Sequence, residues 1–352
     1  MRKMKRSLFL LGLIGVFALT GCDNSGEAGK DVPGMETSGN EGTSGNEEKT
    51  ENDVKGITGD DTVMMAVGEE TVSYGEVLFY LYQLKQKYET SLGAEVWKAE
   101  IEDGETFGEY AKKEIVDQLT ELKIIHAQAV KEDVTLSAEE MTQIERKAQE
   151  YMNSVSEEGK KDYHITLELV KKIYQENVLA GKMFDITTSS VSTEVSDEEA
   201  RQVHLFCIEI ILNGTDKDGS HIELNEKERE KTKKQAAELL KEWKGAEDKA
   251  AFAQANSQSE ETEFVYGADN PPEVFGTEGL SLSAKEFGKM IQGDDSIYLI
   301  YCEEDMDEDA TREKKEEIIR KKQDEIFQKS YTGWSRQYKV IVSTPLWESI
   351  EL

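Results

Sequence analysis

Histidine and cysteine side chains, the commonest metal ligands and proton carriers, are sparse in this sequence. The chain has four histidines and three cysteines, namely His126, His164, His204, His221, Cys22, Cys207 and Cys302. Their spacing fits neither a zinc motif nor a disulfide framework. Burial of Cys207 and Cys302 as free thiols is favoured, with a bridge between them as the alternative. We also find no phosphate-binding glycine loop and no Ser/His/Asp arrangement, so we expect no metal and no cofactor.

The segment Asp216–Ser220 superficially suggests a calcium loop. Aligning Gly219 with the glycine of an EF-hand puts Gly214 at the first ligand position and Asn225 at the last. Neither residue can supply the carboxylate that an EF-hand needs there. The segment is therefore interpreted as a polar turn.

Cys22 is the cysteine with the clearest chemistry. A basic segment, MRKMKR, precedes the apolar run SLFLLGLIGVFAL, which is shorter than the roughly 20 residues of a membrane span. The run ends in Leu19-Thr20-Gly21-Cys22, which resembles the lipobox of bacterial lipoprotein signal peptides. The resemblance implies cleavage after Gly21 and lipid attachment to Cys22. An uncleaved amino-terminal anchor is the alternative.

The charge of the chain limits its partners. The formal net charge is −31, so phosphates are repelled and the charge argues against nucleic acid as a partner.

Residues 22–61 are rich in Gly, Ser, Thr, Asn and Glu and carry few large apolar side chains. Such a composition cannot bury enough surface to fold. We expect residues 1–21 to be the signal peptide and 22–61 to be a disordered acidic tether.

Helical patterns dominate the next part of the chain. Phe107–Glu132 has apolar residues at three- and four-residue steps, and Thr106 with Glu109 forms a capping-box pair. The same kinds of signal predict a hairpin over Val63–Val72 and helices from Ser73 to Tyr88, after Leu136, and from Thr166 to about Phe184. In the first of these helices Glu76 is the expected partner of the Ser73 cap.

The order of these elements resembles the amino-terminal domain of SurA/PrsA-type foldases. The resemblance is carried by the strand-like VMMAV entry, the YGEVLFYLYQLKQKY helix, the Phe107–Glu132 helix and the VTLSAEE segment. It covers roughly Val63–Ile186 and implies a helical chaperone domain, which we place at 62–195.

A different pattern follows. The runs Val203–Leu212 and Ser296–Cys302 read as strands, with helical segments at Lys227–Trp243 and Asp248–Ser257 between them. This order resembles a parvulin prolyl-isomerase domain, which we place at 196–304. Residues 305–352 are expected to form a last helix, Thr311–Trp334, and a tail that returns to the chaperone domain. The predicted fold class is thus α+β and mainly α.

The parvulin resemblance weakens at the site itself. It implies that His204 belongs to a polar cluster beside the twisting amide and that Phe275 binds substrate. Tyr298 stands where the family has a second histidine, so a His204–Tyr298 hydrogen bond could survive there as a structural pair. The alternative for His204 is a buried strand histidine whose nitrogens bond neighbouring groups. The glycine-rich segment of the family is replaced by EFVYGAD at Glu263–Asp269. The parvulin-like domain is therefore interpreted as degenerate.

The sequence leads to a first hypothesis and two alternatives. The first is a chaperone that binds unfolded secreted polypeptides and is anchored by lipid on Cys22 to the extracytoplasmic face of the bacterial cytoplasmic membrane. The second is an active prolyl cis–trans isomerase of the same architecture. The third, a solute-binding lipoprotein, is disfavoured because repeated strand–helix–strand units are missing. The client proteins and the oligomeric state stay open.

Overall fold

The computed structural model of the chain describes residues 59–101, 104–215, 221–350 and 352. These residues divide into two units. The first joins the described residues up to Ser190 with Asp324–Leu352, and the second is Val191–Gln323. The expected signal peptide, Cys22, most of the expected tether and the Asp216–Ser220 turn lie outside the described residues.

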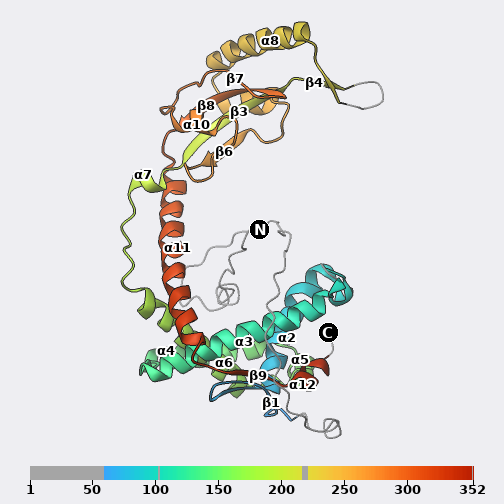
Figure 1. Cartoon of the computed structure of the whole chain (residues 1–352), viewed down its shortest axis with the longest axis vertical. Coiled ribbons are helices and arrows are strands. Elements are labelled where there is room, and N and C mark those ends of the chain that lie inside the picture. The colour runs from blue at the N-terminus through green and yellow to red at the C-terminus, as the bar shows by residue number, and fades with distance from the viewer. Residues whose placement is uncertain (1–58, 102–103, 216–220, 351) are drawn as a thin grey trace. The chain divides into compact units, whose positions relative to one another are not determined.

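The first unit is mainly helical and carries one small sheet (Figure 1). Its elements in chain order are β1 (Val63–Val67), β2 (Glu70–Ser73), α2 (Tyr74–Leu92), the 3-10 helix η1 (Ala94–Lys98), α3 (Phe107–Lys131), α4 (Ala138–Ser154), α5 (Glu157–Asp162), α6 (Leu167–Thr188), the end of α11 (Glu308–Ser335), β9 (Val340–Val342) and α12 (Thr344–Glu348). The sheet is antiparallel with the strand order β2-β1-β9.

Local signals explain where several of these elements begin. Gly68 has a φ of 62° in the turn between β1 and β2, a conformation that glycine adopts without a steric penalty. The Thr106 hydroxyl accepts from the Glu109 N–H, and the Glu109 carboxylate accepts from the Thr106 N–H. Ser137 and Glu140 form the same reciprocal pair at α4. The predicted helix starts are confirmed at these caps.

The expected role of Glu76 is wrong. Ser73 does cap α2 by accepting from the Glu76 N–H, but the Glu76 carboxylate does not return to the cap. It is fully buried and pairs with Lys123 at 2.7 Å and with Lys172 at 2.9 Å. A buried ammonium offers the carboxylate a stronger partner than a surface N–H does.

Glu76 belongs to a buried ionic cluster between α2, α3 and α6. The Lys123 ammonium has no solvent exposure and also lies 2.6 Å from the Glu176 carboxylate. Burial raises the pKa of Glu176, and the negative charge of Glu76 raises it further. The positive charge of Lys123 lowers it but does not cancel the rise. Two carboxylates and the ammonium groups of Lys123 and Lys172 thus balance their charges inside an otherwise apolar core.

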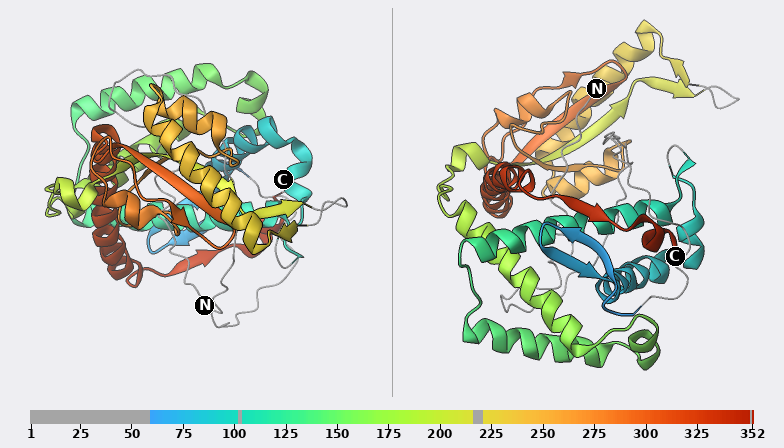
Figure 2. Two further views of the ribbon diagram at one scale, coloured as in Figure 1. Left: turned by 90° about the horizontal axis from the view of Figure 1, so that it is seen from above. Right: turned by 60° about the horizontal axis from the view of Figure 1, so that its bottom comes forward.

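The carboxy-terminal segment completes the first unit. Strand β9 pairs antiparallel with β1, with Ile341 opposite Ala66; Figure 2 shows the two strands side by side. Phe327, Trp347 and Ile350 are buried in the same apolar core as α2, α3 and α6. The return of the tail to the helical part of the chain is therefore a feature of this unit.

Some predicted boundaries and buried positions differ. Helix α2 continues to Leu92 rather than ending at Tyr88, and α6 continues to Thr188 rather than to Phe184. Val130, one of the apolar residues in the helical pattern of Phe107–Glu132, is 59% exposed rather than buried. None of the helices in the described part of the chain is long and apolar enough to span a membrane.

The second unit is built on a four-stranded antiparallel sheet with the order β6-β3-β8-β7. Its elements in chain order are α7 (Asp197–Ala200), β3 (Val203–Ile211), β4 (Asn213–Thr215), β5 (His221–Glu223), α8 (Glu226–Gly245), α9 (Lys249–Asn256), β6 (Glu263–Tyr266), α10 (Gly276–Leu280), β7 (Ile291–Gln292), β8 (Ser296–Glu304) and the start of α11.

Each face of this sheet carries its own apolar core, because successive side chains of a strand point to opposite faces. Phe206 and Ile208 of β3 pack with Trp243 of α8 on one face. Leu205 and Cys207 pack on the other face with a second cluster, which also contains Tyr266, Phe275, Leu282, Ile300 and Cys302. With the helical first unit, this arrangement gives the predicted mainly α, α+β fold class.

Candidate functional site

His204 and Tyr298 lie on opposite faces of the sheet. His204 has the strand parity of Phe206, and the two rings are 5.1 Å apart. Tyr298 pairs with Glu209 across β3 and β8 and packs with the cluster that contains Cys207. Glu209 lies five residue steps along β3 from His204, a distance of about 17 Å along the strand. His204 and Tyr298 therefore do not form a hydrogen bond with each other.

His204 instead has carboxylate neighbours. Its Nε2 lies 2.9 Å from Glu263 Oε1, and its Nδ1 lies 4.0 Å from Asp307 Oδ2. Glu263 begins β6, next to β3, and Asp307 directly precedes α11. His204 of β3 thus contacts β6 through Glu263 and the residue before α11 through Asp307, as a structural histidine would. A catalytic role for His204 stays a prediction.

The polar end of the other face is built around Tyr298. Glu209 Oε1 accepts a hydrogen bond of 2.6 Å from the Ser296 hydroxyl and one of 3.2 Å from the Tyr298 hydroxyl. Burial raises the pKa of Tyr298; the Ser296 hydrogen bond counteracts this shift and the negative charge of Glu209 adds to it. Tyr298 is thus a neutral donor at physiological pH. We call Glu209, Ser296 and Tyr298 the Glu209 cluster.

Phe275 brings apolar surface to this cluster. Its ring is 5% exposed and lies 5.5 Å from the Tyr298 ring and 5.1 Å from the Phe264 ring. Of the three expected site residues, the structure thus brings together Phe275 and Tyr298 and leaves His204 apart. Substrate binding by Phe275 stays a prediction.

The two cysteines of the sheet are free and buried. Burial raises the pKa of the Cys207 thiol well above its usual range and that of Cys302 to about 11. Both are therefore neutral thiols at physiological pH, poor nucleophiles that behave as small apolar side chains. The favoured interpretation of Cys207 and Cys302 is confirmed.

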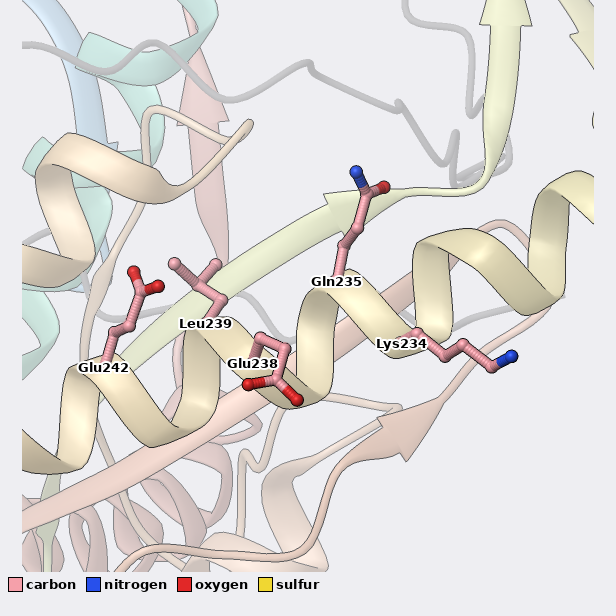
Figure 3. A pocket seen from close by; sticks show the side chains of 5 residues that line it. All are labelled: Lys234, Gln235, Glu238, Leu239 and Glu242. Atoms are coloured by element: carbon pink, nitrogen blue, oxygen red, sulfur yellow. The ribbon is translucent and has the colours of Figure 1, made fainter.

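Two surface depressions of the second unit are lined by residues outside the Glu209 cluster. The first, of about 310 Å³, is lined only by residues of α8, whose side chains fan outward from the helix (Figure 3). One helix face cannot enclose a ligand. A second, of about 260 Å³, lies between the end of β6 and the start of α11. There Lys314 pairs with Asp269 at 2.8 Å and with Glu317 at 2.9 Å, and its hydrogen bond lowers the pKa of the Asp269 carboxyl.

Glu209 is the residue that the sequence analysis missed. The signal was present, because the run VHLFCIEII carries a carboxylate among residues that, apart from His204, are all apolar. A charged residue at such a position needs a partner or an opening to solvent. Within the described residues, no group of three or more His, Cys, Asp or Glu side chains could hold a metal ion.

Comparison with known proteins gives only structural matches. No protein-family model matches the chain, and no curated protein matches it in sequence. Foldase protein PrsA from Streptococcus pneumoniae is 14% identical with a TM-score of 0.28, over 76% of this chain and 91% of that one. PrsA from Lactococcus lactis is 13% identical with a TM-score of 0.31, over 80% and 94%.

A third match comes from Campylobacter jejuni, from work on two structurally related SurA-like chaperones, PEB4 and the periplasmic protein Cj1289. It is 10% identical with a TM-score of 0.30, over 80% of this chain and 98% of that one. The chain is thus similar to structures of the kind of foldase that its sequence resembles.

Proposed function

We propose that this protein is an extracytoplasmic chaperone, anchored by lipid on Cys22, that holds unfolded secreted polypeptides and has little or no prolyl-isomerase activity. The proteins to which it is structurally similar bear the names of foldases and SurA-like chaperones. The anchoring part of the proposal rests on the LTGC sequence at Cys22.

One observation carries the ranking of chaperone above isomerase. The sheet of the second unit is intact, yet His204 and Tyr298 lie on opposite faces of it. An isomerase of this type needs polar groups gathered within hydrogen-bond reach of one amide. Holding an unfolded chain needs only accessible apolar surface, because burial is non-directional. The helical unit has exposed large apolar side chains, among them Leu92, Val130 and Ile341.

The experiment compares holding with catalysis on the mature protein. We expect it to suppress light scattering by a chemically unfolded client at near-stoichiometric amounts, and His204→Ala to retain that effect. We expect it to leave cis-to-trans conversion of a proline tetrapeptide close to the uncatalysed rate. A robust isomerase rate that collapses in His204→Ala would reverse the ranking.

The Glu209 cluster keeps the isomerase alternative open in one specific form. The Tyr298 hydroxyl, which donates to Glu209, lies with its ring beside the apolar Phe275 ring, and a prolyl amide would need the hydroxyl to turn its donor from Glu209 to the substrate. Any isomerase rate should then fall in Tyr298→Phe and be unchanged in His204→Ala. Equal loss in both variants would instead indicate unfolding, which circular dichroism would detect.

A further inference from the structure

We infer that Glu209 makes the polar end of the second sheet a binding site for a lysine or arginine side chain that neighbours an apolar residue in an extended client segment. The inference rests on the proposed function, because it names the kind of segment that the chaperone would select at this site. It makes Glu209 a specificity-determining residue.

The Glu209 carboxylate is held in place without being neutralised. Both hydroxyl donors, from Ser296 and Tyr298, reach the same oxygen, Oε1. A carboxylate has about four acceptor positions on its two oxygens, so Oε2 retains its capacity. Across the described part of the chain, no lysine, arginine or histidine forms an ion pair with the Glu209 carboxylate, whose hydrogen bonds come from these two hydroxyls. A client cation would supply the missing charge.

Apolar surface lies directly beside this carboxylate. Ile291 of β7 pairs with Tyr298 of β8, which pairs with Glu209 of β3, so the three side chains form a row across adjacent strands. Neighbouring strands are about 4.8 Å apart. Val274, which is 46% exposed, flanks the row near Gly293. A carbon at the Cβ position of Gly293 would lie 3.3 Å from Tyr298 Cε2 and 3.5 Å from Val274 Cγ1.

This combination matches the two parts of a basic side chain. The methylene stem of lysine packs on apolar surface while its ammonium reaches a polar group. The Tyr298 ring face also attracts a cation within about 6 Å of its centre. The next apolar residue of the client would cover Val274 and the edge of the apolar cluster that contains Phe275. An acidic residue at the same place would be repelled by Glu209, and a neutral one would gain only the apolar contacts.

The test uses the mature protein and three labelled peptides, acetyl-Gly-Ser-Lys-Pro-Phe-Ser-Gly amide and the versions with Gln or Glu in place of Lys. Fluorescence anisotropy gives each Kd at low and at high salt. We expect the Lys peptide to bind about fivefold tighter than the Gln peptide, the size of one charge-assisted contact at a half-exposed site. The Glu peptide should bind weakest, and high salt should reduce both differences.

Glu209→Gln keeps an acceptor for the two hydroxyls and removes the charge. It should bind the Gln peptide as the wild type does and lose the preference for Lys. Glu261→Gln changes the net charge equally at an exposed position of the same unit and should keep that preference. Thermal melting checks that both variants are folded.

Three results would overturn the inference. These are equal affinities for the three peptides, a Lys preference that survives in Glu209→Gln, and no measurable binding of any peptide by the folded wild type. If the wild type still suppresses client aggregation in these cases, the proposed function stands and only the role of Glu209 fails. Loss of aggregation suppression in the wild type would instead refute the proposed function, whatever the peptides show.

Discussion

Replacing Lys123 by Met should destabilise the helical unit strongly. The Lys123 ammonium is fully buried and lies 2.7 Å from Glu76 and 2.6 Å from Glu176. Methionine fills a similar volume, so the cavity term is small. Its introduction removes the buried positive charge and leaves two carboxylates facing each other, with only Lys172 nearby. The Lys172 side chain is 47% exposed and bonds Glu76, so Glu176 loses most.

The expected cost is about 3–5 kcal/mol, because an uncompensated buried charge is far more expensive than a lost surface pair. For a unit of this size one kcal/mol corresponds to a shift of about 2–4 °C in Tm. The melting transition of the first unit should therefore fall by about 10 °C. The triple variant Lys123→Met, Glu76→Gln, Glu176→Gln removes all three charges and should recover most of that loss.

Calorimetry resolves the transitions of the two units, and hydrogen exchange across α3 identifies the affected one. Arg146→Met is the matched control, since Arg146 pairs with Glu150 on the surface with side chains 61% and 59% exposed. It should cost less than about 0.5 kcal/mol. A Lys123→Met variant that melts within about 2 °C of the wild type, or a triple variant no better than the single one, would refute this reasoning.

Three further predictions concern the anchor, the tail and pH. Cys22→Ala should abolish lipid attachment, and intact-mass spectrometry of the wild-type mature protein without lipid on Cys22 would contradict the anchoring proposal. Truncation after Ser335 removes β9, Trp347 and Ile350 from the first core; hydrogen exchange of β1 and α3 should accelerate strongly, and unchanged protection would refute the structural role of the tail. Glu121→Gln tests linkage to pH. Burial raises the pKa of Glu121 to about 7, with Asp117 adding to it, so the protonated form favours folding and wild-type stability should decline as pH rises through about 7. The Gln variant should match the wild type near pH 4, below the unfolded pKa of a Glu, and exceed it by about 2 kcal/mol near pH 9 after allowance for solvent screening; a constant difference in Tm across this range would show that Glu121 does not titrate as described.

The sequence was most informative about local structure, where the residues that determine a helix start, a turn or a strand lie within a few positions of that feature. The Thr106–Glu109 and Ser137–Glu140 boxes mark the first turns of α3 and α4 because their hydrogen bonds span three residues. Gly68 marks the β1–β2 turn through its own φ angle. The apolar runs that became β3 and β8 were also readable, since strand composition is local.

Tertiary structure decided which of these elements meet and which way their side chains point. Glu76 had the spacing of a cap partner, but α3 and α6 place Lys123 and Lys172 against it, and burial makes that pairing stronger. The sequence allowed a His204–Tyr298 pair, yet the antiparallel register of β3 and β8 sets Tyr298 opposite Glu209 on the other face. A strand shows the alternation of its own side chains, whereas the partner of each residue depends on long-range pairing that no local pattern specifies.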